Sequence, residues 1–118
     1  NKIIKEANRL KYNLIKLKKE KKNIIGYGAP ARVSTITNFA NINSELINYI
    51  IDDSPIKQNR YSPGKHIKIL PKKNNINNKI ENVVVFAYEY FEDIKKKFDK
   101  LNVNFFKPIP FRKIKWVI

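Results

Sequence analysis

The chain has 118 residues, with 25 Lys and Arg against 10 Asp and Glu, one His, and no Cys or Met. A hydrophobic content of 42% fits one folded domain with a single core and excludes a disordered tail. The lack of Cys excludes disulfide scaffolds, thiolate metal sites and Cys nucleophiles, and a single His excludes metal sites that need two imidazoles.

The ends of the chain and its hydropathy indicate the cellular location that we expect for it. No apolar run reaches the roughly 18 residues that span a bilayer, and no signal peptide opens the chain. We therefore expect a cytoplasmic protein without a membrane partner. A lysine-rich start without an initiator Met predicts a fragment of a longer protein.

The formal net charge of +15 raises the question of a nucleic-acid partner. Only four of the 25 basic residues are Arg, the side chain that binds phosphates and base edges bidentately. Lys, Ile and Asn dominate the chain, as the A/T-rich codons of a biased genome would produce. A solvated lysine surface is the favoured interpretation, and nucleic acid is a disfavoured partner.

The first half of the chain predicts one βαβ unit. A helix is expected over residues 1–22, because its apolar residues recur at spacings of 4, 3, 4 and 3: Ile3, Ala7, Leu10, Leu14 and Leu17. A strand over 23–28 and a helix over 30–41 follow, the helix beginning at Pro30 and burying Ile36, Phe39 and Ala40. A second strand is expected over 47–51.

The second half begins with a polar loop over residues 53–66 and a short strand over 66–70. Residues 71–81 are Asn- and Lys-rich and predict a flexible connection or a poor helix. The run at 82–87 is typical of a central strand buried on both faces. A helix over 90–101, a strand over 103–106 and an edge strand over 114–118 complete the prediction, with Trp116 assigned to packing. This alternation indicates an α/β fold with a mostly parallel sheet of about five strands and helices on both faces.

A glycine-rich turn joins the first expected strand to the second helix. Gly26-Tyr-Gly28-Ala-Pro-Ala31 matches G-x-G-x-x-G/A, which is typical of a Rossmann-like three-layer domain. Gly26 is expected to permit the tight turn, Gly28 to admit a ligand close to the backbone, and Ala31 to let the helix pack on the strand. The helix N-terminus would offer free N–H groups to an anion. Asp52, at the end of the second strand, stands near the position of a ribose-binding carboxylate. The equally weighted alternative is that it caps the following loop by accepting hydrogen bonds from neighbouring N–H groups.

The ligand of such a turn is open from the residues alone. A non-catalytic module that binds NAD(P) or another nucleotide is one possibility, although a dinucleotide domain normally has two βαβαβ halves. S-adenosylmethionine folds usually place an acidic residue two positions before the first glycine, and this position is Ile24 here. The fragment is therefore not expected to bind the methyl donor.

Three segments together resemble one family. GYGAPARVSTITNF, IIDDSPIKQNRYSPGKHIKI and VVVFAYEYFEDI are similar to the C-terminal domain of S-adenosylmethionine-dependent C-methyltransferases, including enzymes that act on nucleotide-linked sugars. The resemblance covers about residues 5–112. It implies a single domain over residues 1–118, whose helix over 1–22 leads from a missing upstream methyltransferase domain, and which binds the nucleotide-sugar substrate. The full-length enzyme would use S-adenosylmethionine, whereas this fragment alone is expected to bind no cofactor and to catalyse nothing.

The candidate site combines the glycine turn with the long loop. No catalytic residue and no metal ligand is predicted; His66 is weighed as a general base but is more often structural. Tyr88-Glu89 stands where the family usually has Trp-Asn, so the substrate is open. The predicted substrate-binding residues are Gly26, Tyr27, Gly28, Ala31, Arg32, Asp52, Lys57, Gln58, Tyr61, Pro63, Gly64 and His66.

The turn over 26–31 and the loop over 57–66 both follow strands, and segments that follow parallel strands emerge at the same edge of a sheet. We therefore expect them to meet at the C-terminal edge, where Arg32 and Lys57 would face a bound anion. Gly28→Val is expected to weaken binding more than folding, provided that Gly28 has a negative φ.

Overall fold

A computed structural model describes residues 2–20 and 22–114, apart from the side chains of residues 31 and 32. The described elements form a six-stranded sheet in the order β3-β2-β1-β4-β5-β6. Neighbouring strands are parallel except β5 and β6, which are antiparallel. The prediction of an α/β fold with a mostly parallel sheet is confirmed, with six strands rather than about five.

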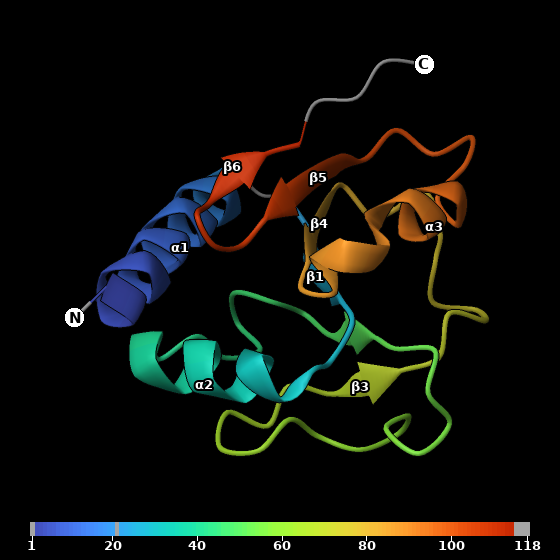
Figure 1. The fold of residues 1–118 in the computed structure, drawn as a ribbon. Helices are drawn as coiled ribbons and strands as arrows, with labels where there is room; N and C mark the ends of the chain where they lie inside the picture. Colours follow the sequence, from blue (N-terminus) through green and yellow to red (C-terminus); the bar gives the residue numbers. More distant parts are fainter. Residues whose placement is uncertain (1, 21, 115–118) are drawn as a thin grey trace.

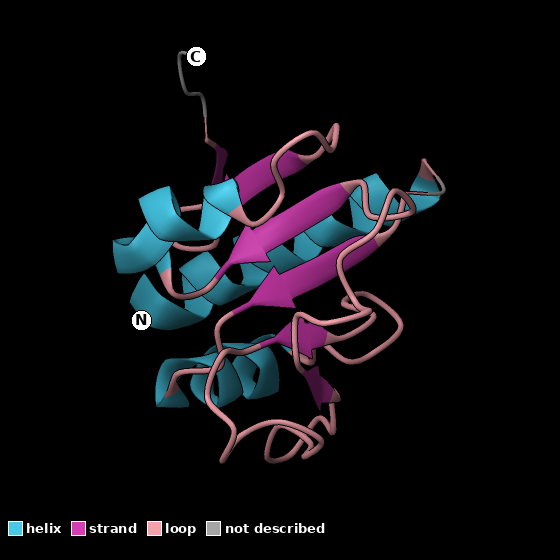
Figure 2. Ribbon diagram, turned by 90° about the vertical axis from the view of Figure 1, so that its right-hand side faces the viewer, coloured by secondary structure: helices cyan, strands magenta, loops and turns pink. Residues whose placement is uncertain are grey.

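The elements, in chain order, are α1 (Lys2–Lys19), β1 (Ile24–Tyr27), α2 (Ala31–Ala40), β2 (Ile50–Ile51), β3 (Ile69–Leu70), β4 (Asn82–Val85), a 3-10 turn (Tyr88–Tyr90), α3 (Phe91–Lys96), β5 (Asn104–Lys107) and β6 (Arg112–Lys113). Figure 1 shows α1 and α2 together on one side of the strands and α3 on the other. The strands fan across the molecule in Figure 2, with the long loops at one end.

Alternate residues of the central strands belong to two apolar clusters, one on each face of the sheet. Ile24 and Val84 join the cluster formed with α1 and α2, whereas Ile25 and Val83 join the cluster formed with α3. All four residues of β1 and of β4 are buried, as a strand with neighbours on both sides and helices on both faces requires. This confirms the prediction that the run beginning at Asn82 is central.

The helices differ in detail from the prediction. In α1 the expected stripe holds, since Ala7, Leu10 and Leu14 are fully buried, although Ile3 is half exposed. In α2 the prediction that Phe39 is buried is wrong: its side chain is 52% exposed. The buried side is instead Val33, Ile36, Thr37 and Ala40, which recur at helical spacing and leave Phe39 on the outer face.

Three other boundaries are corrected. The helix predicted over 90–101 is a 3-10 turn followed by only six residues of α3, and the chain then turns, with Lys100 at a φ of 69°. The strand predicted over 47–51 shortens to Ile50–Ile51. Of the two alternatives for residues 71–81, a connection or a poor helix, the structure shows a connection made of turns. The final described strand is Arg112–Lys113; of the edge strand predicted over 114–118, residues 115–118, including Trp116, lie outside the described residues.

Gly26 lies inside β1 and not in the turn, which corrects its expected role. A Cβ at this position would lie 2.9 Å from Cε2 of Phe86 and 3.1 Å from Cγ1 of Ile50. Glycine is therefore required here because the Phe86 ring packs directly on the strand backbone.

Replacing Gly26 by Ala should lower the free energy of unfolding by about 1–3 kcal/mol, because the new methyl group would overlap the Phe86 ring. Urea denaturation measures this loss. In a Phe86→Leu background the same replacement should destabilise less, since the ring is gone. Equal losses in both backgrounds would contradict the steric explanation.

Candidate functional site

The strand order creates a crevice at the C-terminal edge of the sheet. β1 lies between β2 and β4, so the chain leaves β1 toward one side of the sheet and leaves β4 toward the other. A hollow of about 380 Å³ lies between the two connections. We call it the edge crevice; its lining residues are Tyr27, Gly28, Ala29, Pro30, Asp52, Asp53, Lys57, Ala87, Glu89, Tyr90, Asp93, Ile94 and Lys97.

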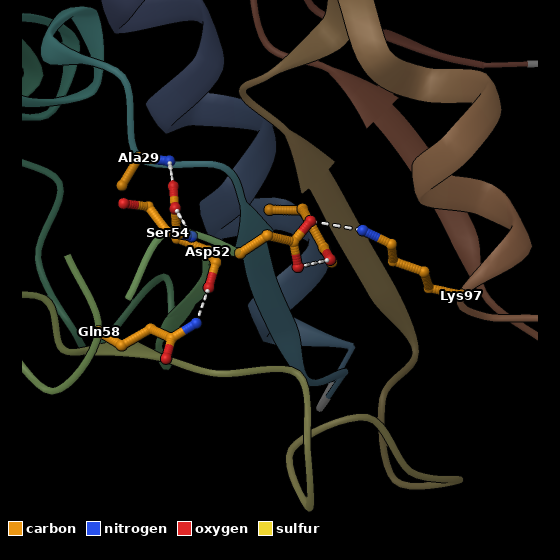
Figure 3. Close-up of polar contacts among 7 residues, drawn as sticks. Ala29, Asp52, Ser54, Gln58 and Lys97 are labelled. Carbon is orange, nitrogen blue, oxygen red and sulfur yellow. Dashed lines mark hydrogen bonds and ion pairs between the residues drawn. The ribbon is translucent and has the colours of Figure 1, made fainter. Parts of the chain in front are cut away.

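Asp52 fixes the wall of the crevice that follows β1 and β2. Its Oδ2 accepts a hydrogen bond from the Ala29 backbone N–H at 2.7 Å, and its Oδ1 accepts one from the Ser54 N–H at 2.8 Å. The Gln58 side chain donates to the Asp52 carbonyl at 2.8 Å. Figure 3 shows Ala29, Ser54 and Gln58 gathered around Asp52. The carboxylate thus ties the glycine turn to the loop after β2.

A second network crosses the crevice floor. The Tyr27 hydroxyl donates to Oδ1 of Asp53 at 2.9 Å, and Lys97 forms an ion pair with Oδ2 of the same carboxylate. The Lys97 ammonium also lies 5.3 Å from the centre of the Tyr27 ring. In Figure 3 Lys97 reaches toward this network from the segment after α3. The network therefore links β1, the end of β2 and α3.

The pKa of each member of this network departs from its ordinary value. Burial raises the pKa of Tyr27 to about 12, so its hydroxyl stays protonated at neutral pH. Burial also acts to raise the pKa of Asp53, but the hydrogen bonds from Lys97 and Tyr27 outweigh it and hold this pKa below its ordinary value. Burial acts to lower the pKa of Lys97, and the bond to Asp53 raises it on balance.

A second hollow, of about 590 Å³, lies between the start of α2 and the long loop. We call it the loop hollow; its lining residues are Ala29, Pro30, Val33, Ser34, Ile56, Lys57, Arg60, Tyr61, Ser62, Pro63 and Ile69. The loop itself is ordered by the backbone: Asn59 N donates to Ile69 O at 2.7 Å and Ile69 N to Arg60 O at 2.8 Å. The predicted functional loop is thus a hairpin-like segment held against β3.

The predicted meeting of the glycine turn and the long loop is confirmed. Lys57 Nζ donates to the Ala29 carbonyl at 3.0 Å, and Asn38 Nδ2 lies 3.5 Å from the Pro63 carbonyl. The two hollows share Ala29, Pro30 and Lys57. Lys57 therefore stands where the turn, the loop and both hollows meet.

The structure distributes the predicted site residues unevenly. Tyr27, Gly28 and Asp52 line the edge crevice, and Tyr61 and Pro63 line the loop hollow. Gly26 is buried in β1 beneath Phe86, and Gln58 is engaged with the Asp52 carbonyl. The side chains of residues 31 and 32 lie outside the described residues, so the expected role of Arg32 stays a prediction.

Gly64 and His66, at the far end of the loop, are not among the residues that line either hollow. Gly64, at a φ of +85°, packs against Asn38, where a Cβ would lie 2.3 Å from Oδ1. The exposed His66 ring has its centre 6.4 Å from that of Tyr61.

Gly28 has a φ of +90°, and a Cβ there would lie 2.5 Å from the Cβ of Ala87. Gly28→Val would therefore strain the fold, and it cannot serve as a selective probe of binding.

Among the lining residues of the edge crevice that the prediction missed are Asp53, Tyr90, Asp93 and Lys97. The last three recur at spacings of 3 and 4, one position before the apolar residues assigned to the helix core. Periodicity therefore carried a signal, because the residues beside a buried stripe lie at the rim of the covered surface. Asp53 offered no signal that distinguished it from Asp52.

Two classes of feature are absent from the described part of the chain. Within residues 2–20 and 22–114, no three His, Cys, Asp or Glu side chains are grouped so as to hold a metal ion. No helix of these residues combines the length and the hydropathy needed to cross a membrane.

The chain was compared with known proteins. The family model described as "C-methyltransferase C-terminal domain" matches residues 1–110. The comparison with curated proteins gave no match.

Replacing Asp52 by Asn should destabilise the protein by about 1–3 kcal/mol. The two backbone N–H groups bond different carboxylate oxygens, and in Asn one of these oxygens is replaced by an NH₂ group that faces a donor. Urea denaturation measures the loss, and Asp99→Asn, on an exposed side chain, is the matched control. Unchanged amide exchange at Ala29 and Ser54 would contradict the anchoring role.

Replacing Lys97 by Gln should lower stability at pH 7 by about 0.5–1 kcal/mol, as expected for a pair whose Asp53 side chain is 49% exposed. Because the folded-state pKa of Asp53 is depressed, the pair stabilises the fold above the ordinary pKa of 3.8 and loses this effect as the pH falls through the lower folded-state value.

The difference in unfolding free energy between wild type and the Lys97→Gln variant should therefore shrink below about pH 3.8. Urea denaturation over a series of pH values measures it. Lys73→Gln, an exposed lysine outside the network, is the control. A difference that stays constant down to pH 2 would show that Lys97 acts through packing and not through its charge.

Proposed function

The chain belongs to the family of C-methyltransferase C-terminal domains, and we propose that it binds and orients the substrate of such an enzyme, a nucleotide-linked sugar. The observation that carries the proposal is the junction at Lys57, where the glycine turn and the long loop enclose two adjoining hollows. These two segments also carry the sequence resemblance to enzymes that act on nucleotide-linked sugars.

The proposed architecture is one Rossmann-like three-layer domain over residues 1–118. Its support is the strand order, which matches that of doubly wound sheets, and the separation of α1 and α2 from α3 by the sheet. The α1 helix would lead from an upstream methyltransferase domain of the same chain. In such an enzyme this domain contributes position: holding the substrate carbon beside the methyl donor replaces a bimolecular encounter by an intramolecular one.

The methyl donor, S-adenosylmethionine, is assigned to the upstream domain. The position two residues before Gly26 is Ile24, whose side chain is fully buried in β1. It offers no carboxylate, and the carboxylate of Asp52 is occupied by two backbone N–H groups. The residues of this chain therefore do not fit the donor, and no methyl-transfer step is assigned to them.

An NAD(P)-binding module is the alternative that the glycine turn allows. The described residues between β2 and β3 contain turns and no helix, and α3 has only six residues. A dinucleotide cleft is normally built from two complete βαβαβ halves, and among the described residues the half formed by β1–β3 lacks its second helix while the half formed by β4–β6 has only the short α3. The geometry thus supports the sugar-nucleotide proposal over the dinucleotide one.

A nucleotide sugar should raise the melting temperature of the 118-residue protein. At a concentration ten times its Kd, a ligand that binds only the folded state stabilises it by about 1.4 kcal/mol, or about 5 °C for a chain of this size. Thermal shift with UDP-glucose and dTDP-glucose measures the effect. Lys57→Gln should reduce the shift, and Lys73→Gln should leave it unchanged.

NAD⁺ and NADP⁺ serve as comparison ligands in the same assay. Stabilisation by either of them, with none by the sugar nucleotides, would overturn the proposal in favour of a dinucleotide module. Methyl transfer by the 118 residues alone, supplied with S-adenosylmethionine and a nucleotide sugar, would contradict the division of labour between the two domains.

A further inference from the structure

We propose that the two hollows hold one elongated ligand in a fixed direction, with its nucleoside and phosphates in the loop hollow and its hydroxyl-bearing end in the edge crevice. The inference rests on the proposed function, because it takes the ligand to be a nucleotide-linked sugar. It goes beyond the proposed function by assigning one end of that ligand to each hollow and by naming the residues that contact each end.

The two hollows adjoin each other. They have volumes of about 380 and 590 Å³ and share Ala29, Pro30 and Lys57 in their walls. A ligand that extends from one hollow into the other must therefore pass the Lys57 ammonium. That ammonium donates to the neutral carbonyl of Ala29, and a phosphate oxygen is a stronger acceptor for it.

The two hollows differ in charge. Among the described residues, the loop hollow is lined by two cations, Lys57 and Arg60, and by no carboxylate. The edge crevice is lined by four carboxylates and two lysines, although the whole chain has only 10 acidic residues and a net charge of +15. A phosphate group is favoured beside Lys57 and Arg60 and is repelled from the crevice.

Exposed apolar surface lies on the same side as the cations. Ile56 is 76% exposed and Tyr61 is 56% exposed, and both line the loop hollow. Large exposed side chains of this kind offer a base or a ribose ring a surface to pack on, and an aromatic ring adds stacking. The loop hollow thus combines the two features that a nucleoside diphosphate needs.

The edge crevice offers acceptors to hydroxyl groups. The carboxylates of Asp52 and Asp53 are already bonded within the protein. Asp93 has no ion-pair partner among the described residues, and Tyr90 is 62% exposed beside it in the crevice wall. Sugar hydroxyls would donate to Asp93 and exchange hydrogen bonds with the Tyr90 hydroxyl.

The test separates the two ends of the ligand. Calorimetric titrations use UDP and dTDP, and then their glucose conjugates, with the 118-residue protein and four variants of exposed side chains. Lys57→Gln and Arg60→Gln should each weaken binding of the nucleoside diphosphate about tenfold, the loss expected for one charge-assisted contact. Asp93→Asn and Tyr90→Phe should leave that binding within twofold of wild type.

The sugar end gives the complementary result. Asp93→Asn and Tyr90→Phe should each reduce, about fivefold, the extra affinity that the glucose conjugate has over the free diphosphate. Lys73→Gln and Asp99→Asn are the charge-matched controls, and both should bind like wild type. The melting temperature of every variant verifies that the fold is retained.

Two results would overturn the inference, and only the second would also contradict the proposed function. If the Asp93→Asn variant binds the free diphosphate more tightly while Arg60→Gln has no effect, the phosphates lie in the crevice. The direction is then wrong and the proposed function survives. If wild-type protein binds neither the diphosphates nor their glucose conjugates, both the direction and the proposed function fail.

Discussion

The bonds from Ala29 and Ser54 to the Asp52 carboxylate hold together the sheet edge that carries the candidate site. They join the turn after β1 to the loop after β2, and those two segments form the walls on which both hollows depend. Asp52 is almost fully buried, so its charge must be balanced by polar contacts, and backbone N–H groups supply them. Without this carboxylate, the turn and the loop would lose the bonds that both make to Asp52, and the contact between Lys57 and Ala29 would lose its fixed neighbour.

Much of this edge could be predicted from the sequence, because it depends on order along the chain. The βαβ pattern determines that the glycine turn and the segment after Asp52 emerge at one edge. The partners of Gly26 and Gly28 could not be predicted. Each glycine is required by a residue some 60 positions away, Phe86 or Ala87, and periodicity carries no information about such contacts. The turn pattern therefore gave the location correctly but assigned Gly26 a turn role that its place in β1 does not allow.

The opposite wall of the crevice shows a second limit of sequence analysis. Its residues lie on the 3-10 turn and α3, which together replace the longer helix expected over 90–101. Lys97 comes directly after α3 ends, yet it reaches Asp53 after β2. The ion pair depends on where the short helix stops and on the pairing of strands far apart in sequence. Helical spacing could place Asp93 and Lys97 at the rim of a buried stripe, but it could not identify the strand end that they face.

Charge acts on two length scales in this protein. The lysine-rich surface gives a net charge of +15, which attracts anions from a distance, but salt screens such fields beyond about 8 Å. Within each hollow the nearest side chains determine the local electrostatic potential. In the edge crevice the carboxylates make this potential more negative than the positive net charge of the chain suggests. On our proposal, a ligand with phosphates at one end is therefore attracted by the charge of the whole molecule and oriented by a few residues. Lys57 stands between the cationic loop hollow and the anionic edge crevice. Its ammonium would therefore both attract a phosphate group and determine which hollow that phosphate occupies.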